Sequence, residues 1–214
     1  MSLRACVWIA LSAIALGGCV ETRFESPLGG RQESCDARWK GLWIGPDPAD
    51  QSAGVYVDSA CHVFVIDKPA ADKPVRRVGL PVRYKQVDGR DYLSVEAAAF
   101  KELVDLDPPY AIEPAPAHAY FFARYTISGD RLEIDMVNSK RVAQLVIDDK
   151  IDGTVSKSTN GLHVFVRGDP ARMLEIVRSE PIFDGVTPTI LVRSKQSVDA
   201  FERNLERAAA KKPQ

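Results

Sequence analysis

The sequence lacks the motifs that mark the common catalytic sites. Its 214 residues contain no Gly-x-Ser-x-Gly nucleophile elbow, no phosphate-binding loop, no His-Glu-x-x-His pair and no Gly-x-Gly-x-x-Gly run. Histidine is scarce, and the spacing of the three that are present (His62, His118 and His163) suits no metal-ligand set. We therefore predict no catalytic residues, no metal site and no cofactor, and we do not expect an enzyme.

An excess of charge of one sign is lacking too. The chain has 28 Lys and Arg against 29 Asp and Glu, which gives a formal net charge of −1. This balance provides no basic field that would hold nucleic acid, so nucleic acid is not an expected partner. After residue 19, no apolar run approaches the ~20 residues that a membrane-spanning helix needs.

The chain begins with a pattern typical of an export signal. Arg4 supplies a positive charge, and residues 5–16 are apolar except for Ser12. A buried N-terminal helix, the alternative, would show polar residues at a 3.6-residue period, and this run shows almost none. The run ends in Leu16-Gly17-Gly18-Cys19, which resembles the lipobox of bacterial lipoproteins. The resemblance implies cleavage between Gly18 and Cys19 and lipidation of the Cys19 sulfur by a diacylglyceryl group.

The same resemblance implies a location and a first partner. A lipidated protein of this kind is anchored in the cell envelope, and the membrane is its partner. Because one acyl chain binds a bilayer only marginally, stable anchoring requires two or more. Cys19 is followed by Val20 rather than Asp, which in enteric-type lipoproteins points to the outer membrane, facing the periplasm. A Gram-positive surface lipoprotein is the alternative.

Two of the four cysteines remain once the signal and the lipidation site are set aside. In an oxidising compartment we expect Cys35 and Cys61 to form a disulfide rather than two separate buried thiols. Such a loop closure stabilises a fold by about 3 to 4 kcal/mol in the chain-entropy model.

Composition divides the chain into three parts. Residues 1–18 form the signal peptide. Residues 19–34 are polar, contain Pro27 and the Gly29-Gly30 pair, and show no apolar period, so they predict a flexible tether after the lipidated Cys19. Residues 35–210 form one β-rich globular domain with a C-terminal helix.

Short alternating segments dominate that domain. The clearest pair covers residues 120–127 and 131–137, and Asp88-Gly89 and Asn160-Gly161 mark further hairpins. Helical patterns are predicted over residues 96–105, 139–149, 170–178 and 195–210. The predicted fold class is α+β, mainly antiparallel β, as a curled sheet or small β-barrel with inserted helices. A flat sheet with helices on one face is the rival.

Gly41-Leu42-Trp43 resembles the Gly-x-Trp that opens the first strand of lipocalin-type barrels. The resemblance implies a lipocalin-like barrel with a lipophilic ligand inside. We expect aromatic side chains to line that site, namely Trp43, Phe64, Tyr84, Phe122 and Tyr125. The expected function is therefore a non-enzymatic binding module for a lipophilic ligand or an envelope partner.

Two other functions stay open. The apolar stripe of the C-terminal helix, which includes Phe201 and Leu205, would suit a scaffold or assembly accessory protein of the envelope. A hydrolase of envelope polymers or lipids would require a cleft in which a nucleophile, a base and an orienting group converge.

Overall fold

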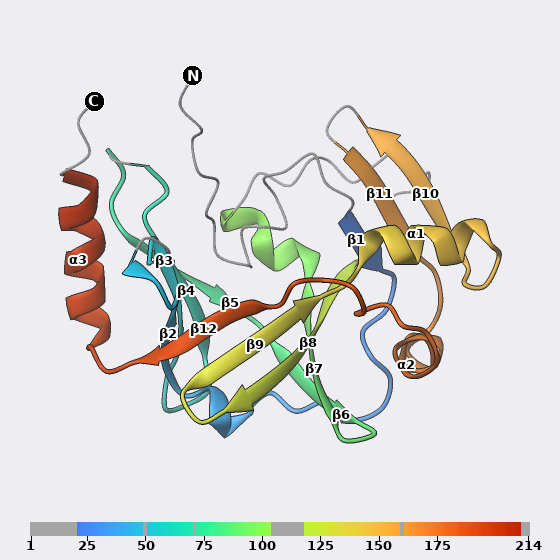
Figure 1. Ribbon diagram of the computed structural model, residues 1–214, viewed down its shortest axis with the longest axis horizontal. Helices are drawn as coiled ribbons and strands as arrows, with labels where there is room; N and C mark the ends of the chain where they lie inside the picture. Colours follow the sequence, from blue (N-terminus) through green and yellow to red (C-terminus); the bar gives the residue numbers. More distant parts are fainter. Residues whose placement is uncertain (1–20, 49–50, 71, 104–117, 159–160, 211–214) are drawn as a thin grey trace.

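The computed structural model describes residues 21–48, 51–70, 72–103, 118–158 and 161–210 (Figure 1). These ranges contain one twelve-stranded mixed sheet. The strands are β1 (Glu21–Phe24), β2 (Gly41–Ile44), β3 (Ala53–Val57), β4 (Val63–Asp67), β5 (Arg76–Leu80), β6 (Arg83–Val87), β7 (Arg90–Glu96), β8 (Tyr120–Ser128), β9 (Arg131–Met136), β10 (Gly153–Ser158), β11 (Gly161–Val166) and β12 (Thr189–Ser194). The helices are α1 (Ser139–Ile147), α2 (Pro170–Ser179) and α3 (Val198–Ala210), with 3-10 turns η1 (Ala37–Trp39) and η3 (Ala97–Glu102).

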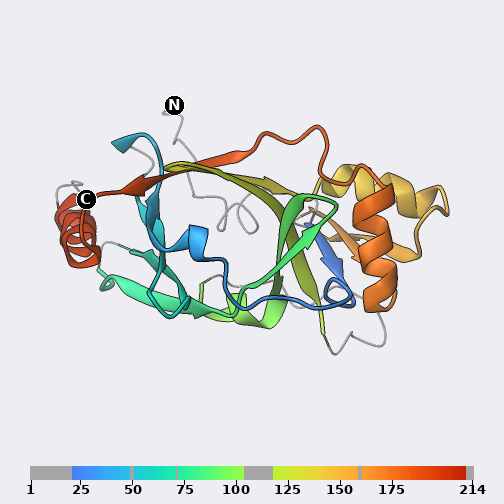
Figure 2. The same cartoon turned by 90° about the horizontal axis from the view of Figure 1, so that it is seen from below.

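Most of the strands form an antiparallel meander. Strands β2 to β5 pair in sequence order, and so do β6 to β9. Strand β12 pairs with β9 on one side and with β2 on the other, so it joins the two runs. Figure 2 shows that the joined sheet curls around an interior. The predicted class, α+β with a mainly antiparallel curled sheet, inserted helices and a C-terminal helix, is confirmed.

The small-barrel alternative is wrong, because the sheet is not closed. Among the described strands, β5 and β6 do not pair although they are adjacent in sequence. Between them Pro81 has no N–H to donate, and the Val82 amide donates to the Leu80 carbonyl over 2.9 Å. The outer edge of β6 is instead bridged by Glu33, which exchanges two backbone hydrogen bonds of 2.8 Å with Tyr84.

A second lobe, made of β1, β10, β11, α1 and α2, packs beside β8 (Figure 1). Strand β1 pairs in parallel with β11, which pairs antiparallel with β10. Strand β8 contributes side chains to two hydrophobic cores, because successive side chains of a strand point to opposite faces. Phe121 packs inside the curled sheet, and Phe122 packs in the second lobe.

The flexible tether predicted over residues 19–34 is wrong from residue 21 onward. Glu21–Phe24 is strand β1, and both Phe24 and Leu28 are buried. The ring of Phe24 stacks on Phe122 with centroids 4.2 Å apart. A four-residue strand whose partner lies far later in the chain carries no periodic signal, so the sequence pattern missed it. The folded domain therefore begins at residue 21 and not at residue 35.

Local signals placed the turns and helix starts well. Asp88 and Gly89 both have positive φ, at 50° and 76°, as the hairpin turn requires. Asn138 and Asp169 each accept a hydrogen bond from the backbone N–H three residues on, at the starts of α1 and α2. The α-helix predicted over residues 96–105 is instead the shorter 3-10 turn η3.

Helix α3 covers the outer face of the curled sheet. Phe201 and Leu205 are buried, and they pack with Leu42, Ile44 and Ile66. Because its apolar stripe is part of the core, α3 does not offer that stripe to another protein.

Candidate functional site

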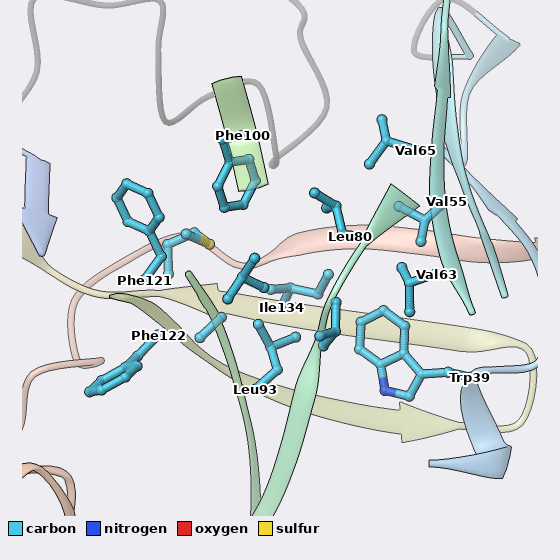
Figure 3. Close-up of a pocket in the computed structure, with 14 residues that line it drawn as sticks. Trp39, Val55, Val63, Val65, Leu80, Leu93, Phe100, Phe121, Phe122 and Ile134 are labelled. Atoms are coloured by element: carbon cyan, nitrogen blue, oxygen red, sulfur yellow. The ribbon is translucent and has the colours of Figure 1, made fainter. Parts of the chain in front are cut away.

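An apolar pocket lies inside the curled sheet (Figure 3). Its volume open to water-sized molecules is about 50 Å³. Residues of β3, β4, β5, β7, β8 and β9 line it, together with Trp39 from η1, Phe100 from η3 and Val82 from the link between β5 and β6. The lining residues are Trp39, Val55, Val63, Val65, Leu80, Val82, Leu93, Val95, Phe100, Phe121, Phe122, Ala123, Ile134 and Met136. No residue in this lining carries a charge.

Strand alternation explains most of the lining. Side chains two residues apart share one face of a strand, so Val63 and Val65 both point inward from β4. The turn η3 adds Phe100, whose ring meets the edge of Phe121 at a centroid distance of 5.4 Å. Branched and aromatic side chains thus fill most of the interior and leave a narrow space.

Trp39 is the one lining residue whose side chain carries an N–H group. The side chain is buried, and its ring lies 5.8 Å from that of Tyr84 and 5.1 Å from that of Tyr125. Its Nε1 has no hydrogen-bond partner among the described residues. Because a buried donor without an acceptor costs about 1 to 3 kcal/mol, this atom is a candidate contact for a ligand oxygen.

A polar network around η1 fixes the position of Trp39. Asp36 accepts hydrogen bonds from the Arg38 guanidinium and the Tyr125 hydroxyl, both at 2.7 Å. Arg38 also pairs with Asp91 at 2.7 Å. Burial alone would raise the pKa of Asp36, but the hydrogen bonds from Arg38 and Tyr125 outweigh it and lower that pKa. Burial and the bond to Asp36 raise the pKa of Tyr125, so its hydroxyl stays protonated and donates.

Trp43 lies outside the pocket and under Arg193. The indole Nε1 of Trp43 donates to the Trp39 carbonyl over 2.6 Å. The Arg193 guanidinium stacks 4.2 Å from the Trp43 ring and donates to the carbonyls of Arg38 and Lys40. Through these bonds the last strand, β12, holds η1 against the first strand of the meander, β2.

The predicted disulfide between Cys35 and Cys61 is confirmed. The two Cα atoms are 5.4 Å apart. Cys35 directly precedes the η1 network, and Cys61 lies between β3 and β4. The bond therefore ties the segment that leads into η1 to the β3–β4 hairpin.

Of the five aromatic residues predicted to line a ligand site, only Phe122 is among the residues around this pocket, and its ring points away from the space and stacks on Phe24. Tyr84 and Tyr125 are buried behind Trp39. Phe64 points away from the interior and packs with Tyr56 at 6.3 Å. Trp43, the fifth, lies outside the pocket and under Arg193.

The sequence pattern gave no reason to prefer Trp39 over Trp43, and it did not single out Phe100. Alternation within a single short strand is a signal that could have found inward valines such as Val63 and Val65. The predicted cleavage residue Gly18 and the predicted lipidation site Cys19 lie outside the described residues.

Comparisons with protein-family models, with curated proteins and with solved structures find no match. In the part of the chain that the structure describes, no helix combines the length and apolarity that a membrane crossing requires. Within that same part, no three His, Cys, Asp or Glu residues are grouped so that they could hold a metal ion.

Proposed function

We propose that this protein is an envelope lipoprotein, anchored through Cys19, whose domain binds a lipophilic ligand without chemical conversion. The apolar pocket inside the curled sheet is the observation that carries the proposal. An apolar lining without charges favours an apolar ligand, because each buried CH₂ group contributes about 0.8 kcal/mol. The lipobox resemblance at Leu16-Gly17-Gly18-Cys19 carries the anchor and, through Val20, the outer-membrane location facing the periplasm.

The size of the pocket selects a slender ligand. Its 50 Å³ is well below the ~150 Å³ of an apolar cavity that stays dry and admits benzene. A part of one alkyl or acyl chain fits this space, whereas a ring system would require side chains to move. The uncharged lining gives a charged headgroup no partner, so the headgroup stays outside and the chain is what the protein recognises.

The topology supports a lipocalin-like version of this proposal. The first strand of the meander, β2, pairs with the last, β12, as a ring of strands requires. Trp43, from the Gly-x-Trp segment, packs under Arg193 beside η1. In this version the fold is a lipocalin-like curled sheet that stays open between β5 and β6. The second lobe combines β1, which precedes β2, with the segment between β9 and β12.

Tryptophan fluorescence can locate the ligand. In a chain that begins at residue 19, Trp39 and Trp43 are the only tryptophans, and only Trp39 lines the pocket. A brominated fatty acid should quench the Trp43→Phe variant, which keeps Trp39, much more than it quenches the Trp39→Phe variant. Equal quenching in the two variants, or none in either, would contradict a ligand in this pocket.

A pair of alanines provides a matched test of affinity. Ala123 lines the pocket, whereas Ala143 is equally buried in the second lobe. Leucine at either position overpacks a core and destabilises it by about 1 to 3 kcal/mol. Only Ala123→Leu should abolish fatty-acid binding, and equal losses in both variants would mean that general destabilisation is the cause.

The two other candidate functions have less support. The scaffold function relied on the apolar stripe of α3, and Phe201 and Leu205 from that stripe are buried in the domain. A hydrolase needs a convergent nucleophile, base and orienting group, and the side chains that converge on the described pocket are apolar.

A further inference from the structure

The start of strand β1 lies very close in sequence to the proposed lipidation site. Glu21 is the first residue of β1, and the three residues that follow it in the strand, Thr22, Arg23 and Phe24, are buried. The two residue steps from Cys19 to Glu21 span at most ~7 Å however they are arranged. A flexible tether of fifteen residues would instead reach ~20 Å.

That short reach restricts the orientation of the domain. A folded domain of ~190 residues has a radius of gyration of ~16 Å. A lipid anchor ~7 Å from β1 therefore cannot let the domain turn freely above the bilayer. Only orientations in which the start of β1 faces the membrane are accessible.

The strand register identifies what else lies at that end. Because β1 and β11 are parallel, Glu21 is level with His163, and β11 itself starts at Gly161. Strand β10 ends at the same level, where Ser158 pairs with Gly161. At ~3.3 Å per residue, the paired ends of β10 and β11 extend ~7 Å beyond Glu21, which equals the reach of the anchor.

We propose that the paired ends of β10 and β11, at Ser158 and Gly161, face the phospholipid surface and that the domain is held there in one orientation. This inference rests on the proposed anchor at Cys19. The described residues at these strand ends, 156–158 and 161–162, include one lysine and no acidic residue, so an anionic surface does not repel them. Figure 1 shows the start of β1 and these strand ends on the upper side of the molecule, and the β6–β7 turn on the lower side.

Lipid-borne quenchers can test the orientation. With Cys19 lipidated and Cys35 bonded to Cys61, an introduced cysteine is the one free thiol of the mature protein. A fluorophore is attached to Ser158→Cys at the end of β10 or to Arg90→Cys at the β6–β7 turn. Vesicles of phosphatidylcholine and phosphatidylglycerol carry nitroxide-labelled lipid. Quenching should be strong at position 158 and weak at position 90.

A variant with a longer linker tests whether the short segment between Cys19 and β1 causes this orientation. Fifteen Gly and Ser residues inserted after Val20 give the segment between the anchor and β1 a reach of ~20 Å. The linker should lower quenching at position 158 toward the value at position 90 while the protein still floats with the vesicles. Equal quenching at the two positions of the vesicle-bound protein without the linker overturns the orientation alone. A protein that does not float with the vesicles overturns the anchor, and with it the orientation.

Discussion

Removal of the disulfide is the perturbation whose effect can be worked out most directly. The double variant Cys35→Ser/Cys61→Ser opens a loop with a sequence separation of 26 residues. In the chain-entropy model, a loop of that size stabilises the folded state by about 3.5 kcal/mol, because its closure restricts the unfolded chain. With an m-value of about 2 to 3 kcal/mol/M, the midpoint of urea unfolding should fall by roughly 1 to 2 M.

The assay is equilibrium urea unfolding followed by tryptophan emission, with the unmodified protein measured both oxidised and reduced. Reduction should reproduce the shift seen in the double variant, because both open the same loop. Hydrogen exchange adds a local readout, since the bond ties down the segment in which Glu33 and Tyr84 exchange backbone hydrogen bonds. Their two amides should lose protection more than those of β11. A midpoint unchanged by reduction would refute the loop-closure argument.

Three further predictions concern stability. Phe24→Ala removes a buried ring and should lower the free energy of unfolding, measured with urea, by about 3 to 5 kcal/mol. Arg31→Ala, at an exposed side chain, is the control and should change it by less than about 0.5 kcal/mol. Equally small effects in both variants would mean that β1 is not part of the core. Gly29→Ala should destabilise the fold by about 1 to 3 kcal/mol, because the added Cβ would lie 2.4 Å from a backbone oxygen at the start of α2. Gly79→Ala is the control, because the nearest contact of its Cβ would be at 4.0 Å. Asp36→Asn should lower the stability of the fold by about 1.5 to 3 kcal/mol at pH 7, the range for hydrogen bonds to a charged group. Because the folded-state pKa of Asp36 is lowered, this contribution is present above the unfolded pKa of ~3.9 and is lost as the pH falls through the folded value. The stabilities of the variant and the unmodified protein should therefore converge in acid.

Local rules account for the parts of this fold that the sequence revealed. Strand β9 alternates apolar and polar residues over its whole length, and β8 does so from Ala123 onward. The turn that joins them contains Gly129 at a φ of 59°. The caps at Asn138 and Asp169 depend on residues only three positions apart. Such features are encoded within one short stretch, so they can be read before any long-range contact is known.

The second lobe shows what local patterns cannot reveal. Phe122 faces away from the interior of the curled sheet and is nevertheless buried, because β1 and its neighbours cover that face. Strand β1 exists because its partner β11 is present, and the two are separated by most of the chain. Neither the burial of Phe122 nor the strand at Glu21 follows from periodicity in its own segment.

The candidate site was missed for a related reason. Aromatic residues are the markers from which the sequence predicts a ligand site, but branched aliphatic residues from several strands form most of the lining. Trp43 appeared in the recognisable Gly-x-Trp segment, while Trp39, four residues earlier, lines the pocket. Which of two nearby tryptophans faces inward depends on η1, whose position is set by bonds to Tyr125, Asp91 and Arg193 from distant strands.

Membrane attachment at residue 19 underlies both the proposed location of the protein and the proposed orientation of its domain. The most direct test is the mass of the N-terminal tryptic peptide of the protein isolated from its native membrane. That peptide should begin at Cys19 and carry the added mass of a diacylglyceryl group on sulfur. A peptide that begins upstream of residue 19, or an unmodified thiol at Cys19, would contradict the account.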